Sequence, residues 1–192
     1  MPATMAAKIL DGKALGQTIR DGLGQEAKAL ARTGVQPGLA VVLVGEDPAS
    51  QIYVRSKTKA CAEAGFRTFD HHLPADTPEG ALVELVRALN VDPGVDGILV
   101  QLPLPKGIDS RRILLTIDPA KDVDGFHPDS LGRLVMGEPR FIPCTPFGVM
   151  KLIAESGALV AGAHAVVVGR SITVGKPVAL LLTAADATVT LC

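Results

Sequence analysis

Tyr53 and Lys57 are the first residues whose types and spacing could do chemistry. They lie four apart in a segment predicted to be helical, so their side chains share one face of the helix. A phenol and an amine that point into the same pocket could transfer protons, if burial or neighbouring groups lower the pKa of the lysine. The alternative is that Lys57 is one more solvated helix lysine, like Lys59, and that Tyr53 only packs.

Gln101 is the second candidate, because it follows a predicted strand and precedes Pro103 and Pro105. This placement puts an amide at the carboxyl end of a parallel strand, the edge of an α/β sheet where ligands bind. The prolines restrict the backbone, and either could follow a cis peptide bond. The alternative is a rigid loop in which Gln101 only satisfies backbone groups.

Asp122 and Asp124 form the third candidate, in the run 121–125 (KDVDG). We expect the two carboxylates to point in different directions, one capping a turn and the other meeting a ligand. No third carboxylate or histidine stands at ligand spacing, so we expect no metal site. The four histidines have no nucleophile or partner pattern and are expected to be surface or structural residues.

A possible phosphate site lies at 166–177, where a strand, a turn of small residues and a helix start follow in order. Backbone N–H groups at such a turn, with the helix dipole behind them, favour an anion. Ser171 stands where the second glycine of the usual GxGxxG pattern would be, so a tight turn without a ligand is the alternative. Arg170 beside the turn favours the 2′-phosphate of NADP over NAD.

Aliphatic runs and helical patterns alternate along the chain, which predicts an α/β fold with a parallel sheet. We expect helices over 11–31, 48–64, 76–89 and 145–156 and from Gly175, and strands over 39–44, 95–102, 165–168 and 187–191. The segment 106–143 is rich in Gly, Pro, Asp and Arg and is expected to be a connector, apart from a short periodic stretch at 111–117. A second domain should begin near Pro143.

Composition excludes several classes of function. With 47% hydrophobic and 20% charged residues and a net charge of −1, the chain can bury a core and shows no basic cluster for nucleic acid. Its apolar runs are too short to cross a membrane. Residues 1–8 show no secretory pattern, so a cytoplasmic location is expected. The three cysteines are widely spaced and are expected to be reduced, structural thiols.

Together these segments resemble the bifunctional methylenetetrahydrofolate dehydrogenase/methenyltetrahydrofolate cyclohydrolase family. The matching motifs, in order, are 44–45 (VG) together with 50–57 (SQIYVRSK), then 96–105 (DGILVQLPLP), 121–125 (KDVDG), 143–146 (PCTP) with Gly148, and 168–177 (VGRSITVGKP). Five motifs in the family's order are highly specific. Short-chain dehydrogenases also use Tyr and Lys four apart, but there the pair follows the nucleotide turn, whereas here it precedes Gly169.

The resemblance implies an amino-terminal folate-binding catalytic domain over 1–142 and the first part of a Rossmann-like NADP-binding domain over 143–192. It implies oxidation of 5,10-methylenetetrahydrofolate and hydrolysis of the methenyl product to 10-formyltetrahydrofolate, within one-carbon metabolism and purine biosynthesis, by a homodimer. Lys57 would be the central catalytic group, Tyr53 would stack on the folate and Gln101 would hydrogen-bond to Lys57. Asp124 would hold the pterin. The cofactor would bind at the turn formed by Gly169, Arg170, Ser171 and Gly175.

The resemblance also implies that the Rossmann part is truncated, because family members continue beyond the position of Cys192. A strand edge left open would be unusual for a complete nucleotide-binding domain. The alternative function is therefore a non-catalytic fragment that keeps the folate-facing domain.

Overall fold

The structure, a computed structural model, describes residues 7–192, so most of the segment 1–8 lies outside the described residues. The chain forms two compact units. The larger comprises Ile19–Ile142, and the smaller comprises Pro143–Cys192 together with the chain up to Thr18. Both contain parallel strands connected through helices, which confirms the predicted α/β class.

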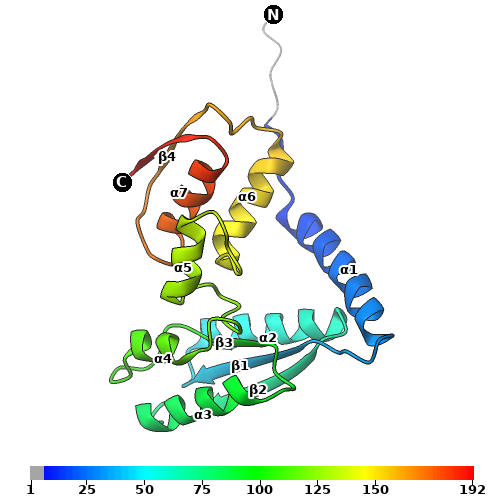
Figure 1. Ribbon diagram of the computed structural model, residues 1–192, viewed down its shortest axis with the longest axis vertical. Helices are drawn as coiled ribbons and strands as arrows, with labels where there is room; N and C mark the ends of the chain where they lie inside the picture. Colours follow the sequence, from blue (N-terminus) through cyan, green and yellow to red (C-terminus); the bar gives the residue numbers. More distant parts are fainter. Residues whose placement is uncertain (1–6) are drawn as a thin grey trace, which may run out of the picture. The chain divides into compact units, whose positions relative to one another are not determined.

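The larger unit contains a parallel sheet with the strand order β2-β1-β3. Strand β1 (Gly38–Val44) is central and pairs with β2 (Arg67–Leu73) on one side and with β3 (Gly97–Val100) on the other. Helices α2 (Pro48–Glu63) and α3 (Glu79–Val91) lie on opposite sides of these strands (Figure 1). The sheet is therefore covered on both faces, as its continuous aliphatic strands predict.

Strand β1 supplies both cores because alternate side chains point to opposite faces. Ala40, Val42 and Val44 pack on the side of α3 and of the short helix α4 (Ser110–Thr116). Val41 and Leu43 pack on the side of α2, where they join the following three residues: Val54, Leu99 and Val123.

Helix α2 begins and ends at the residues that its sequence indicates. The Asp47 side chain accepts a hydrogen bond from Ser50 N at 2.8 Å, and Pro48 takes the first helical position. Gly65 follows the end of the helix with a φ of +85°, a conformation that glycine adopts without strain. These signals place the whole of the Tyr53 to Lys57 segment on one regular helix.

Two elements were not predicted. Strand β2 lies at the edge of the sheet, and its polar sequence lacks the aliphatic run that marked the other strands. The expected connector 106–143 is also wrong in part, because it contains the helix α5 (Pro128–Val135). Helix α4 coincides with the periodic stretch at 111–117 that was excepted from the connector. The side chain of His127 caps α5 by accepting from Asp129 N at 3.1 Å, so this histidine is structural, as expected.

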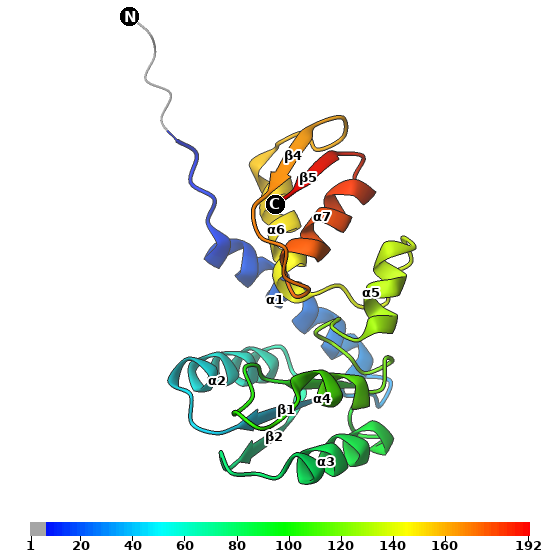
Figure 2. The ribbon, with the colours of Figure 1, turned by 90° about the vertical axis from the view of Figure 1, so that its left-hand side faces the viewer.

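The smaller unit contains α6 (Cys144–Ser156), β4 (His164–Val167), α7 (Gly175–Ala184) and β5 (Thr188–Leu191). Strands β4 and β5 are parallel, and both helices lie beside them (Figure 2). The contacts come from Val149, Met150 and Ile153 of α6 and from Val178 and Leu182 of α7. Helix α1 (Gly12–Ala31) is divided between the two units at Thr18.

The three cysteines form no disulfide, which agrees with reduced thiols. Only Cys61 is partly buried, whereas Cys144 and Cys192 are exposed, so the expectation of three structural thiols is wrong for these two. Within residues 7–192, no helix is long and apolar enough to cross a bilayer.

Candidate functional site

The topology of the larger unit marks one place where a ligand should bind. From β1 the chain passes to β2 on one side of the sheet and then crosses to β3 on the other side of β1. The connections after β1 and β3 therefore diverge onto opposite faces, which leaves a crevice at the carboxyl ends of these two strands. Gln101 directly follows β3 at this point, and α2, which carries Lys57, starts shortly after the end of β1.

The structure brings Lys57 and Gln101 together. Lys57 Nζ donates a hydrogen bond to Gln101 Oε1 at 3.1 Å, and Gln101 Nε2 donates to Leu102 O at 2.6 Å. The second bond fixes the orientation of the amide, so that its oxygen faces the lysine. Gln101 N donates to Val42 O at 2.9 Å, which attaches the residue to the central strand. The Leu102–Pro103 peptide bond is cis, as considered from the sequence.

Tyr53 shares the Lys57 flank of α2 and remains accessible. Val54 and Ser50 are buried against the rest of the unit, whereas the Tyr53 side chain is 60% exposed. This exposure does not fit the alternative in which Tyr53 only packs. An exposed aromatic ring one helical turn from the lysine offers a flat apolar surface to a planar ligand.

Asp124 is the acidic member of the site. Burial raises the pKa of its carboxyl group to about 6, the Lys57 ammonium acts in the opposite direction, and the Asp122 carboxylate raises the pKa further. Lys57 thus acts on Asp124 through its charge, yet among the described residues the two form no ion pair within 4.0 Å. A carboxyl group poised in this way can change protonation state near neutral pH.

Asp122 has the structural role expected for one of the two carboxylates. Its Oδ2 accepts hydrogen bonds from His127 N at 2.9 Å and from Ser130 Oγ at 2.8 Å. Sequence reasoning missed Ser130, because no local pattern connects a serine in a loop-like segment to an aspartate eight residues earlier.

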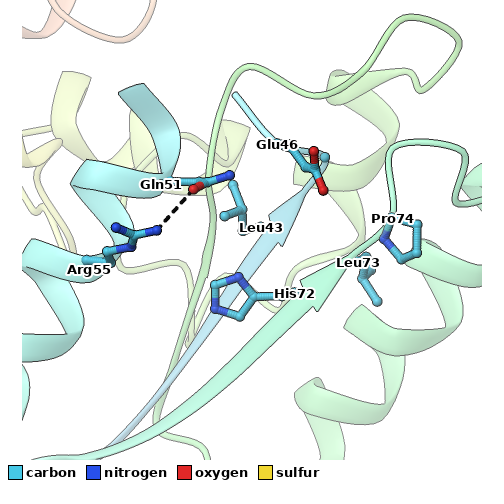
Figure 3. A pocket seen from close by; sticks show the side chains of 8 residues that line it. Leu43, Glu46, Gln51, Arg55, His72, Leu73 and Pro74 are labelled. Carbon is cyan, nitrogen blue, oxygen red and sulfur yellow. Dashed lines mark hydrogen bonds between the residues drawn. The ribbon is translucent and has the colours of Figure 1, made fainter. Parts of the chain in front are cut away.

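A second hollow lies on the opposite flank of α2 and does not include the lysine site. It has a volume of about 380 Å³ and is lined by Leu43, Gly45, Glu46, Gln51, Arg55, His72, Leu73 and Pro74. Arg55 Nη2 donates to Gln51 Oε1 at 3.1 Å across its edge (Figure 3). Neither Lys57 nor Gln101 lines it, so the two flanks of the helix face separate surroundings.

The turn predicted to bind a nucleotide lies in the smaller unit, between β4 and α7. Gly169 has a φ of +116°, and a Cβ at Gly175 would collide with the carbonyl group of Gly169. Both positions therefore require glycine, as a tight phosphate-binding turn does. The Ser171 hydroxyl accepts from Val174 N at 3.1 Å and from Gly175 N at 3.3 Å, which holds the start of α7. Arg170 is exposed and has no protein partner among residues 7–192.

These residues fit the phosphates of a dinucleotide, because the turn exposes a free guanidinium beside a helix N-terminus. Within the described residues, no group of three or more His, Cys, Asp or Glu side chains could hold a metal ion.

The fold and the two candidate sites describe one class of protein. It is an α/β protein with a hydrogen-bonded lysine and glutamine at the switch point of one parallel sheet, and with a glycine turn suited to a dinucleotide in its other unit. The sequence model for the tetrahydrofolate dehydrogenase/cyclohydrolase catalytic domain matches residues 10–124, and that for the NAD(P)-binding domain of the same proteins matches residues 143–192. The chain belongs to the tetrahydrofolate dehydrogenase/cyclohydrolase family, as its motifs predict.

Relatives and solved structures agree with this assignment. The chain is 55% identical over 188 residues to the bifunctional protein FolD of Bordetella avium and 53% identical over 188 residues to that of Acetivibrio thermocellus. Each alignment covers 98% of this chain and 66% of the relative, so the chain spans slightly less than two thirds of these proteins.

Two solved structures share the fold. The bifunctional FolD enzyme from Campylobacter jejuni superimposes with a TM-score of 0.94 at 46% identity, covering 97% of this chain and 67% of the other. The Trypanosoma brucei enzyme, solved with NADP and an inhibitor, superimposes with a TM-score of 0.93 at 42% identity, covering 96% of this chain and 64% of the other.

Proposed function

We propose that the protein oxidises 5,10-methylenetetrahydrofolate with NADP and hydrolyses the methenyl product to 10-formyltetrahydrofolate. The observation that carries the proposal is the hydrogen bond from Lys57 to Gln101 at a sheet switch point, in a chain that belongs to this family. The relatives that match over 98% of the chain are named as bifunctional proteins.

Lys57 is the proposed catalytic group of the hydrolysis. Water adds through its oxygen to the carbon of the methenyl bridge and loses one proton, which leaves a hydroxyl group on that carbon. The bond from the carbon to one folate nitrogen then breaks as the hydroxyl loses its proton to become the formyl carbonyl and the nitrogen takes up a proton, so that the reaction releases one proton overall. In its unprotonated form the Lys57 side chain can accept the proton that water loses and can donate one to the folate nitrogen, and in that form it does not repel the cationic substrate. Gln101 fixes the position of the amine through its oriented amide oxygen.

Tyr53 and Asp124 are the proposed groups that bind and orient the folate. The exposed ring of Tyr53 provides a stacking surface for a flat ligand. The Asp124 carboxylate can accept hydrogen bonds from the N–H groups of a pterin, an arrangement that a charged acceptor strengthens. Because both residues lie near Lys57 in the same unit, one bound ring system can meet all three side chains.

NADP is the proposed cofactor, and it supplies the nicotinamide that accepts a hydride in the oxidation. Gly169, Arg170, Ser171 and Gly175 would hold its phosphates. The family's second domain is described as NAD(P)-binding, and the Trypanosoma brucei relative was solved with NADP. The free, exposed guanidinium of Arg170 favours the additional 2′-phosphate of NADP.

We further propose a domain boundary at residue 143, where the match to the NAD(P)-binding domain begins. A homodimer in the cytoplasm, serving one-carbon metabolism and purine biosynthesis without nucleic-acid or membrane partners, completes the proposal. The alternative of a non-catalytic folate-domain fragment is less favoured, because the matched relatives are bifunctional and the Lys57–Gln101 pair is intact.

The test uses the protein expressed from its complete coding region. NADP reduction with 5,10-methylenetetrahydrofolate measures the oxidation, and loss of the methenyl chromophore measures the hydrolysis. Lys57→Ala should slow the hydrolysis by about 10²- to 10⁴-fold, the usual contribution of a positioned proton-transfer group.

Lys59→Ala is the matched control, because Lys59 is an exposed lysine on the same helix and, within residues 7–192, forms an ion pair only with Glu63, at 3.8 Å. Hydrolysis at the parent rate in Lys57→Ala would contradict the catalytic role. Absence of both reactions in the parent protein would contradict the proposed function.

A further inference from the structure

Asp122 and Ser130 are buried in a way that their place in the sequence does not suggest. Each side chain is only 1% exposed, and together with Ser50 they are the buried polar residues of the described chain. Burial of a carboxylate is costly unless hydrogen bonds compensate it. The burial of the Asp122 carboxylate beside the candidate site therefore points to a specific role for this residue.

The surroundings of Asp122 compensate its burial. One oxygen, Oδ2, accepts from both Ser130 Oγ and His127 N. His127 is the residue before the first turn of α5, and Ser130 lies in that turn, so the carboxylate sits at the positive end of the helix. Asp122 is therefore attached to α5 by two hydrogen bonds to a negatively charged acceptor, the stronger kind.

The same segment is attached to the strand that delivers Gln101. Ile98 N in β3 donates to Lys121 O at 2.8 Å, and Ile98 pairs with Asp122 in an isolated parallel bridge. Gly125 N donates to Asp122 O at 3.1 Å and closes a tight turn around Asp124. Asp124 is thus held in a turn whose first residue is fixed both to β3 and to α5.

We propose that Asp122 is a positioning residue, anchored by Ser130 and the His127 N–H, that holds Asp124 in place near Lys57. The proposal rests on the proposed function, in which Asp124 and Lys57 face the same folate. Asp122 itself does not touch the substrate in this role. It acts by fixing the turn and by placing a negative charge next to Asp124.

The charge of Asp122 has a measurable consequence. Three influences act on Asp124: burial and the Asp122 carboxylate raise its pKa, and the Lys57 ammonium lowers it. Removing the charge at position 122 should therefore make Asp124 easier to ionise. A residue that only stabilised the fold would not produce this specific change.

Two variants separate the charge from the anchor. Asp122→Asn keeps an acceptor oxygen for Ser130 and His127 N but loses the negative charge. Ser130→Ala keeps the charge but loses one of the two hydrogen bonds. Thr77→Val is the matched control, because it removes a hydroxyl whose hydrogen bond, to Pro74 O at 2.6 Å, lies outside the site.

The readouts are an NMR titration of the Asp124 carboxyl carbon and the pH profile of methenyltetrahydrofolate hydrolysis. Asp122→Asn should move the Asp124 midpoint below its parent value near 6 and shift the acidic limb of the profile in the same direction. Ser130→Ala should lower kcat/KM about ten- to hundredfold, because small displacements of catalytic groups are costly. Thr77→Val should match the parent protein in both measurements.

The outcomes distinguish this proposal from the proposed function. If the parent protein does not turn over folate, the function fails, and the midpoint of Asp124 in Asp122→Asn still decides the proposal. An unchanged midpoint in a folded Asp122→Asn protein, verified by hydrogen exchange in β1, overturns it. Parent kinetics in Ser130→Ala would overturn the anchoring role.

Discussion

Replacing Asp124 with asparagine should make the larger unit more stable at neutral pH. The pKa of Asp124 in the folded protein, about 6, lies above the ordinary value of 3.8, mainly because the carboxyl group is buried. A raised pKa means that the folded state holds the proton more tightly than the unfolded state. The stabilisation that comes from this tighter proton binding by Asp124 is therefore fully present below about pH 4 and is lost as the pH rises through about 6.

The size of the effect follows from the shift. At about 1.4 kcal/mol per pKa unit, a rise from 3.8 to about 6 corresponds to a free energy on the order of 3 kcal/mol. Asparagine has nearly the same shape and no charge at any pH. The stability of Asp124→Asn relative to the parent protein should therefore increase by about this amount between pH 4 and pH 7.

Hydrogen exchange at the β1 amides reports on the larger unit by itself. Parent and variant are compared at the same pH, so the intrinsic pH dependence of exchange cancels. For amides that exchange through global opening, the ratio of the two rates should change about a hundredfold across this range. Asp76→Asn, a change at an exposed carboxylate, is the control and should show no such trend.

If the ratio of the exchange rates of the parent protein and Asp124→Asn stays constant from pH 4 to pH 7, the reasoning is refuted. It would mean that Asp124 is ionised as easily in the folded protein as in the unfolded chain. Loss of hydrolysis in the stabilised variant would indicate that the site keeps a charged group at the expense of stability.

Three further changes test other parts of the structure. Gln101→Ala removes the acceptor of the Lys57 hydrogen bond and should shift the pH profile of hydrolysis, whereas an unchanged profile would exclude that role. Gly175→Ala places a methyl group against the Gly169 carbonyl and should weaken NADP binding in a titration by at least tenfold; parent affinity would contradict the tight turn. Gly97→Ala should collide with Val123 and destabilise the larger unit by about 1–3 kcal/mol in urea unfolding, and parent stability would argue against this close packing.

Elements with strong local signals could be predicted from the sequence. The aliphatic runs of β1 and β3 are buried on both faces, and the Asp47-Pro48 start of α2 is found where the capping residues place it. Strand β2 was missed because it lies at the edge of the sheet with a neighbouring strand on one side only, and its sequence includes the exposed residues Arg67, Asp70 and His72 in place of a continuous aliphatic run. Helix α5 was missed because histidine, its capping residue, is not a usual helix-start signal.

The candidate site was predictable only where its members are local or belong to a recognised motif. Tyr53 and Lys57 are one turn apart, so helical spacing is enough to place them together. The contact between Lys57 and Gln101 depends on the strand order, which puts the carboxyl end of β3 beside that of β1. The exposure of Tyr53 and the raised pKa of Asp124 depend on tertiary packing and are not visible in the sequence.

The run 121–124 connects several elements of the larger unit. Lys121 Nζ donates to Leu89 O at 3.2 Å and Asp92 O at 2.9 Å and so closes the carboxyl end of α3. Asp122 binds the start of α5, and Val123 packs into the core beneath α2. Asp124 acts electrostatically with Lys57. Four consecutive side chains thus act on three helices and on Lys57, the proposed catalytic residue, so we expect a substitution at any of the first three to displace the fourth.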